Sequence, residues 1–170
     1  MFKFFLQFCL FILFFTFSAY SKNFDKIIIN GNERISNETI LVFSEIPDNK
    51  FLDENSLNEI LKKLYKSSFF KDVTVKIEND NLIIDVLENP IIQTVFIEGI
   101  KKKTTEESLY EILSLRNRSS YNSTLLKKDE ATILNFLKDE GYYFSTLTSY
   151  YNDLDDNKID LFYQIDLGEK

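Results

Sequence analysis

The chain has 170 residues and a net charge of −7, and 44% of its residues are hydrophobic and 28% charged. This balance is ordinary for globular proteins and excludes a disordered tail or a collagen-like repeat. The net negative charge also argues against a nucleic-acid binder, because no basic stripe is available to displace counterions from phosphates; the one basic triplet, residues 101–103, is typical of a solvated loop.

The first segment differs in composition from everything that follows. Residues 4–21 are uncharged and largely apolar, Lys3 precedes them, and Ala19 and Ser21 have the spacing of small residues at a cleavage site. This pattern predicts a secretory signal peptide over residues 1–21, with an uncleaved membrane anchor as the alternative. The single cysteine, Cys9, lies inside this segment. The exported part is therefore expected to have no disulfide and no metal site with a cysteine ligand.

Residues 26–87 show the pattern of a small unit that mixes helices and strands. A β-branched run from Lys26 ends at turn residues 30–32, and Ser36 or Asn37 can cap a short helix containing Ile40, Leu41 and Phe43. Residues 53–68 predict a second helix, acidic at its start and basic toward its end as the helix dipole favours. Its apolar face has the spacing i, i+3, i+4, i+7, i+8 and consists of Leu57, Ile60, Leu61, Leu64 and Tyr65.

A hairpin completes this first unit. Val73, Val75 and Ile77 alternate with polar residues, which predicts a half-buried strand. Residues 79–81 predict a tight turn, and residues 82–87 predict the returning strand. The predicted order is strand, helix, helix, strand, strand.

The second half of the chain repeats this order. The run IIQTVFIEG at residues 91–99 matches the first strand and its glycine, and Thr104 to Glu107 has the capping-box pattern that predicts the start of a helix. A longer helix is predicted from Asn122 to about Glu140, with Gly141 in the C′ position. Residues 142–170 predict a long hairpin with its turn at residues 155–157. Alternate residues of its second strand are expected to face one way: Ile159, Leu161, Tyr163, Ile165 and Leu167.

The two units meet at Glu88, Asn89 and Pro90. Pro90 biases Asn89 toward an extended conformation, so we expect the last strand of the first unit to pass directly into the first strand of the second. Such a joint is short and stiff. The predicted division is a signal peptide at residues 1–21, a first domain at 22–89 and a second domain at 90–170.

Three stretches in order carry a family resemblance: IIINGNERIS, LYKSSFFKDVTVKIENDNLIIDVLENPIIQTVFIEG and FLKDEGYYFSTLTSYYNDLDDNKIDLFYQIDLGEK. The sequence resembles the start of the BamA-type outer-membrane protein assembly factors, a signal peptide followed by the first two POTRA domains. The resemblance covers nearly all of residues 24–170. It implies an α+β fold of two tandem POTRA modules, each β-α-α-β-β with a three-stranded sheet packed against two helices.

The resemblance also implies a function. The chain would be the periplasmic arm of an assembly factor for outer-membrane β-barrels, and its partners would be unfolded outer-membrane proteins and accessory lipoproteins. Binding would occur by β-augmentation, in which an extended client segment adds to a sheet edge through backbone hydrogen bonds. By family analogy the edge strands contain Val73, Thr74, Val75, Lys76 and Ile77 in the first unit and Phe144, Thr146 and Thr148 in the second. Thr74 and Lys76 would point outward, although Lys76 is equally compatible with an edge that is protected from pairing.

The sequence predicts neither an enzyme nor a cofactor or metal site. It has no histidine, no cysteine outside the signal segment, and no P-loop or dinucleotide glycine pattern among its four glycines. Asp153, Asp155 and Asn157 are spaced like calcium ligands, but Lys158 and Gln164 stand where such a loop requires glycine and glutamate. We therefore interpret this cluster as a hairpin turn.

Several related functions stay open at this stage. A two-partner secretion transporter or a translocation-and-assembly protein would share the modules. A cell-division protein would have one such module behind an uncleaved anchor. A stand-alone periplasmic adaptor is a further alternative. The sequence contains no series of strands able to close a membrane barrel, and it stops where a further module would begin. We expect a truncated assembly factor located at the periplasmic face of the outer membrane of a Gram-negative bacterium, attached through a barrel absent from this chain.

Overall fold

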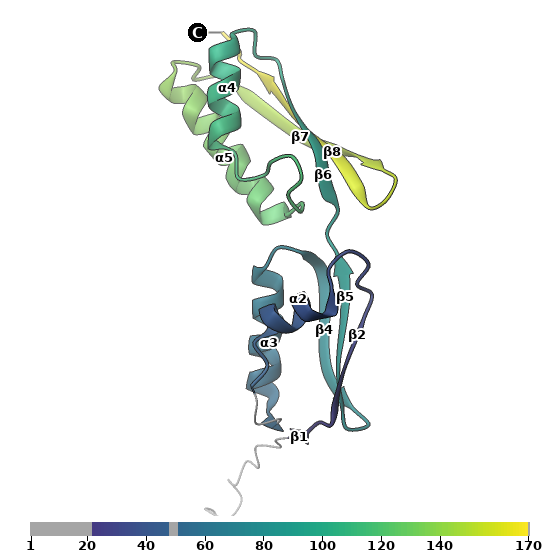
Figure 1. The fold of residues 1–170 in the computed structure, drawn as a ribbon. Helices are drawn as coiled ribbons and strands as arrows, with labels where there is room; N and C mark the ends of the chain where they lie inside the picture. The colour runs from purple at the N-terminus through teal and green to yellow at the C-terminus, as the bar shows by residue number, and fades with distance from the viewer. Residues whose placement is uncertain (1–21, 48–50, 170) are drawn as a thin grey trace, which may run out of the picture.

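The computed structural model describes residues 22–47 and 51–169, so the predicted signal peptide and Cys9 lie outside the described residues. Figure 1 shows two modules placed end to end, each with its helices over one face of its sheet. The chain passes between them once, directly from strand β5 into strand β6.

The first module follows the predicted order. It contains β2 (Lys26–Asn30), α2 (Asn37–Ser44), α3 (Glu54–Lys66), β4 (Phe70–Glu78) and β5 (Asn81–Glu88). The sheet has the order β2-β5-β4, with β2 parallel and β4 antiparallel to the central strand β5. A small additional pair, β1 (Lys22–Asn23) and β3 (Phe51–Leu52), was not predicted.

The second module has the same topology. It contains β6 (Ile91–Glu98), α4 (Lys103–Ile112), α5 (Ser123–Asp139), β7 (Thr146–Leu154) and β8 (Lys158–Asp166). Its sheet has the order β6-β8-β7, again with a parallel first strand and an antiparallel hairpin. The α+β class and the repeated β-α-α-β-β unit are therefore present as predicted.

Each module has its own hydrophobic core between the helices and one face of the sheet. In the first, Ile60 and Leu64 of α3 pack with Leu82 and Ile84 of β5. In the second, Ile133 and Leu137 of α5 pack with alternate residues of β8, which are Ile159, Leu161, Tyr163 and Ile165. The strand alternation that predicted the inward face of residues 159–165 is confirmed.

Two glycines stand at equivalent positions of the repeat. Gly31 and Gly99 follow the first strand of each module, and both have a left-handed backbone with φ of 82° and 90°. A Cβ atom on Gly31 would collide with the carbonyl oxygen of Val86, and one on Gly99 with that of Ile165. Glycine is required at both sites because the loop passes directly against the end of the central strand.

The helix starts were predicted with mixed success. Ser36 caps α2, and the Asn122 side chain caps α5 by accepting hydrogen bonds from the amides of Thr124 and Leu125. The capping box at Thr104 is wrong, because α4 begins at Lys103 and its N-cap residue, Lys102, makes no side-chain cap. The first turn is closed instead by the backbone, where the amides of Thr105 and Glu106 donate to the Lys102 carbonyl.

Candidate functional site

The predicted edge strands lie at sheet edges in both modules. β4 is one of the two outer strands of the first sheet, and β7 is one of the two outer strands of the second. Val73 to Ile77 lie within β4, and Thr146 and Thr148 lie within β7. Phe144 lies before β7, because that strand begins at Thr146, and its side chain is 72% exposed.

The hairpin geometry shows which backbone groups of β4 face the free edge. The loop between β4 and β5 has two residues, Asn79 and Asp80, and both have left-handed φ angles of 48° and 59°. In such a turn the flanking residues, here Glu78 and Asn81, form a hydrogen-bonded pair, and bonded and non-bonded pairs then alternate along the ladder. The N–H and C=O groups of Val73, Val75 and Ile77 therefore point away from β5.

Thr74 and Lys76 contribute to the edge in a different way. Their side chains are exposed, as predicted, but by the same alternation their backbone groups pair with β5. The Lys76 ammonium lies 3.2 Å from the Glu78 carboxylate, so its charge is balanced locally. A backbone-directed ligand would thus bond to Val75 and Ile77 while its side chains lie beside Thr74 and Lys76.

The end of β4 nearest the joint is already occupied by side chains. The amide of Val73 donates to the Tyr65 hydroxyl at 3.2 Å and to the Asp72 carboxylate at 3.0 Å, and the Tyr65 hydroxyl donates to that carboxylate at 2.9 Å. We call this arrangement the Tyr65–Asp72 cap. Because the cap satisfies Val73, the open ladder of β4 begins at Val75.

The second sheet has an exposed row of aromatic rings on the face opposite its helices. Phe162 of β8 stacks on Phe96 of β6 with ring centroids 4.7 Å apart, and on Tyr150 of β7 with centroids 4.9 Å apart. Such cross-strand pairs stabilise the sheet beyond the area they bury. The row ends at the edge strand β7, where Tyr150 is 40% exposed.

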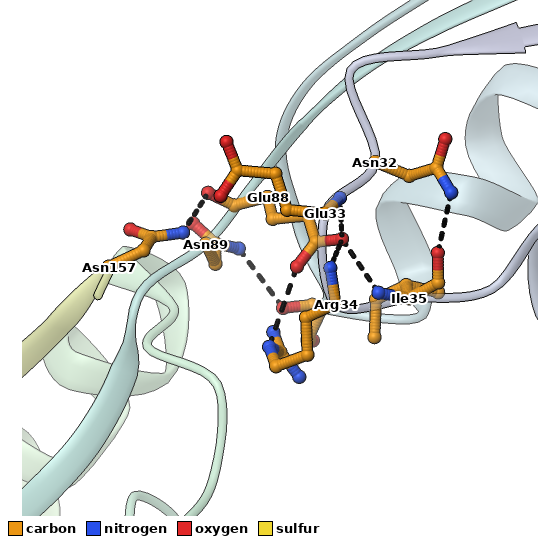
Figure 2. A network of polar contacts seen from close by, with 8 residues as sticks. Asn32, Glu33, Arg34, Ile35, Glu88, Asn89 and Asn157 are labelled. Atoms are coloured by element: carbon orange, nitrogen blue, oxygen red, sulfur yellow. Dashed lines mark hydrogen bonds and ion pairs between the residues drawn. The ribbon is translucent and has the colours of Figure 1, made fainter.

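The joint is held by a buried carboxylate. Glu88 is 4% exposed, and its Oε1 atom accepts hydrogen bonds from the amides of Glu33, Arg34 and Ile35 at 2.8 to 3.0 Å. The Arg34 side chain lies 3.4 Å from the other carboxylate oxygen. Figure 2 shows these contacts converging on Glu88 from the loop between β2 and α2. The last residue of β5 is thereby tied to the body of the first module.

Asn89 and Pro90 extend this anchoring toward the second module. The Asn89 amide donates to the Phe69 carbonyl at 2.8 Å and its side chain to the Ser68 carbonyl at 3.0 Å. The Pro90 carbonyl accepts from the Tyr121 amide at 2.8 Å. Two side chains of the second module also reach across, since Asn122 donates to the Ser68 hydroxyl and Asn157 to the Glu88 carbonyl at 3.2 and 3.4 Å.

Two buried carboxylates, those of Glu88 and Asp129, were not predicted from the sequence. Glu88 was placed at the joint, but nothing in the linear pattern indicated that its carboxylate binds a loop more than fifty residues away. Asp129 of α5 is 1% exposed and accepts from the amides of Ser114 and Leu115 and from the Tyr163 hydroxyl. Burial, reinforced by Asp129, raises the pKa of Tyr163. For Asp129, the sequence signal was a charged residue at a position of α5 where the helical spacing calls for an apolar one.

The part of the chain that the structure describes has neither a metal-ligand cluster nor a membrane-spanning helix. Within residues 22–47 and 51–169, no group of three or more acidic, cysteine or histidine side chains is placed to hold a metal ion. No helix in these ranges is long and apolar enough to cross a membrane. Residues 155–157 form the turn between β7 and β8, as predicted.

Comparison with known families finds a match for the second module. Residues 90–168 match the family model described as POTRA, surface antigen variable number repeat. A curated relative, the outer membrane protein assembly factor BamA of Neorickettsia risticii (strain Illinois), is 20% identical over 150 residues. That match covers 88% of this chain and 20% of the relative, so the chain spans about a fifth of the relative's length.

Solved structures show the same fold. The N-terminal domain of Omp85 from Thermosynechococcus elongatus matches with a TM-score of 0.59 and 15% identity, over 86% of this chain and 63% of that one. POTRA1-2 of Omp85 from Anabaena matches with a TM-score of 0.57 and 12% identity, over 90% of this chain and 99% of that one. The POTRA fold recognised from the sequence is thereby confirmed, by the family match of the second module and by the fold shared with the two-module structure.

Proposed function

We propose that this chain, a tandem of POTRA modules of the BamA type, is the periplasmic arm of an outer-membrane protein assembly factor and binds unfolded β-barrel proteins by strand addition. The observation that carries the proposal is the open edge of β4, where the outward backbone groups of Val75 and Ile77 meet no partner strand among the residues that the structure describes. β7 offers a second edge of the same kind.

Strand addition suits a client whose sequence varies. Backbone N–H and C=O groups are common to all peptides, so an edge can bind many segments that alternate apolar and polar residues, as barrel strands do. The exposed Thr74 and Lys76 side chains add little restriction on the face opposite the helices. Accessory lipoproteins are a second class of partner that the family relationship supports.

Rigid presentation is the other requirement of this function. An edge that binds extended segments must keep its register while the client moves, and the bonds of Asn122 to Ser68 and of Asn157 to Glu88 across the joint support a fixed orientation of the two modules. The modules then act as a spacer that holds two edges at a set separation.

The test uses a photo-reactive residue in place of Lys76, which reports only ligands on the β4 edge. The probe is a peptide of about eight residues that alternates apolar and polar side chains, long enough at ~3.3 Å per residue to cover the open ladder. Val75→Pro removes one outward N–H without breaking the bonds to β5, because proline is tolerated where the amide faces away from the sheet. Val75→Ala is the matched control, since it shortens the side chain and keeps the N–H.

We expect Val75→Pro to lower the cross-linking yield about tenfold, as loss of one backbone hydrogen bond and a steric block would do. Val75→Ala should retain most of the yield. Equal yields for the two variants would show that the peptide does not bind the β4 edge. Fractionation of the native host with an antibody against residues 22–170 tests the location, and a soluble periplasmic signal would favour a stand-alone adaptor.

A further inference from the structure

We propose that the cleft between the two modules holds an apolar side chain of the same client segment that pairs with β4. This inference rests on the proposed function, because it assigns a binding site to the part of the client that extends past the open edge. The client would then contact the protein twice: its backbone would pair with β4 of the first module, and one of its side chains would lie in the cleft between the modules.

The cleft has a volume of 820 Å³ and lies beside the joint. Both modules contribute to it: Tyr65 and Leu87 line it from the first, and Tyr121, Tyr151 and Leu154 from the second. The rings of Tyr121 and Tyr151 lie 5.3 Å apart and are tilted by 58°, so they form one aromatic wall. Such a site is large enough for a bulky side chain.

Both edge strands run into this cleft. β4 begins there, since Phe70 and Lys71 line it, and β7 ends there, since Asp153 and Leu154 line it. The chain thus runs toward the cleft along β7, and it runs away from the cleft along β4. A segment that leaves the β4 edge on the side of the joint therefore comes directly to the cleft.

The structure also shows why the segment leaves the edge at this point. The Tyr65–Asp72 cap occupies the Val73 amide, and the β4–β5 register shifts between Phe70 and Asp72. A bulge of this kind ends regular pairing and twists the strand. The next residues of the client thus cannot continue the ladder and must turn away beside Tyr65.

The lining chemistry favours an aliphatic or aromatic side chain. Leu87 is 53% exposed, Tyr151 45% and Leu154 36%, so apolar surface is left open on both walls. Charged side chains also line the cleft: Lys71, Asp153 and Lys158, of which Lys158 pairs with Asp156 at 3.2 Å. The Glu88 carboxylate is already engaged by three amides and Arg34. Covering these side chains gives a gain in affinity from apolar burial.

The experiment compares three peptides on the purified full-length protein. The first is the peptide of about eight residues used above, which covers the open ladder at ~3.3 Å per residue. The second and third carry the same extension, with one phenylalanine, at the amino or the carboxyl end. Only one end can lie on the side of the joint, so the other extended peptide is a control of identical composition.

We expect one extended peptide to bind about tenfold more tightly than the short one, which is the effect of burying one large apolar side chain. Leu87→Lys, which places a charge on one wall, and Thr124→Trp, which fills the cleft from α5, should each abolish this gain. Val42→Lys changes a side chain that is 72% exposed and does not line the cleft, and it should leave the gain intact. All variants must unfold at the same urea concentration as the parent.

The outcomes separate this inference from the proposed function. If the short peptide binds at position 76 and neither extension improves its affinity, the cleft proposal is overturned and strand addition stands. A gain that persists in both Leu87→Lys and Thr124→Trp overturns it equally. If the short peptide fails to cross-link at position 76, the proposed function falls, and the cleft proposal falls with it.

Discussion

The Glu88 carboxylate accepts a hydrogen bond from the amide of Ile35 at 2.8 Å, and this contact joins the last residue of β5 to the loop that follows β2. The same oxygen accepts from the two preceding amides, so one acidic group satisfies three consecutive donors, of which the Ile35 amide is buried. The joint begins at this anchored residue.

Glu88→Ala is expected to destabilise the first module by about 3 kcal/mol, because it removes the acceptor of three backbone donors, one of them buried, and the partner of Arg34. Glu88→Gln keeps one acceptor oxygen and loses the contact with Arg34, so its cost should be nearer 1 kcal/mol. Urea unfolding followed by circular dichroism measures both. An equal loss of unfolding free energy in the two variants would mean that the hydrogen bonds from the three amides to Glu88 do not stabilise the module.

The orientation of the modules is expected to depend on two asparagines of the second module. Asn122→Ser keeps a capping oxygen but is too short to reach Ser68, and Asn157→Gly keeps the left-handed turn but removes the donor to Glu88. The double variant should show a broader distribution of inter-module angles in small-angle scattering. Asn79→Gly, in the distant β4–β5 turn, is the control. Identical scattering profiles for all three proteins would assign the rigidity to Pro90 and the backbone bonds alone.

Removing the Tyr65–Asp72 cap should lengthen the open edge of β4. In a Tyr65→Phe, Asp72→Ala variant the Val73 amide loses both side-chain acceptors, so its hydrogen exchange should become faster. The Val75 amide in the same protein should keep its rate and is the internal control. An unchanged Val73 rate would show that this amide is bonded elsewhere.

Acid should weaken the start of α3. The Ser56 hydroxyl and the Ser56 amide donate to Asp53 and lower the pKa of its carboxyl below the ordinary value of 3.8. A lowered folded-state pKa stabilises the protein above the unfolded pKa, and this stabilisation is lost as the pH falls through the folded value. Asp53→Asn keeps a capping oxygen without the titration. Its destabilisation relative to the parent should be present at pH 7 and vanish below pH 3.8; a difference that is independent of pH would contradict the assignment.

Local periodicity was sufficient for the architecture. The spacing of Leu57, Ile60, Leu61 and Leu64 predicted α3, and the alternation in residues 159–165 predicted the inward face of β8, because one buried face is specified by the sequence itself. Tyr65 was assigned to the same apolar face, yet it is 40% exposed and its hydroxyl reaches the edge strand. The position of the Tyr65 side chain depends on where β4 lies in space, and the spacing of apolar residues in a helix gives no information on that.

The candidate site was predictable in outline only. The family resemblance indicated the edge strands, but the outward amides follow from the two-residue turn at Asn79 and Asp80, and the cap on Val73 follows from tertiary packing. The cleft has no linear signature, since its walls come from Tyr65 and Leu87 in one module and Tyr121 and Tyr151 in the other. Surfaces formed between modules arise only after both have folded.

Residue-resolved hydrogen exchange during peptide binding tests the central claim most directly. Strand addition to β4 predicts that the alternating peptide slows exchange at Val75 and Ile77, whose amides face the free edge, and leaves Thr74 and Lys76 unchanged, because their amides already pair with β5. Slowing at all four positions, or at none of them, would contradict strand addition at this edge.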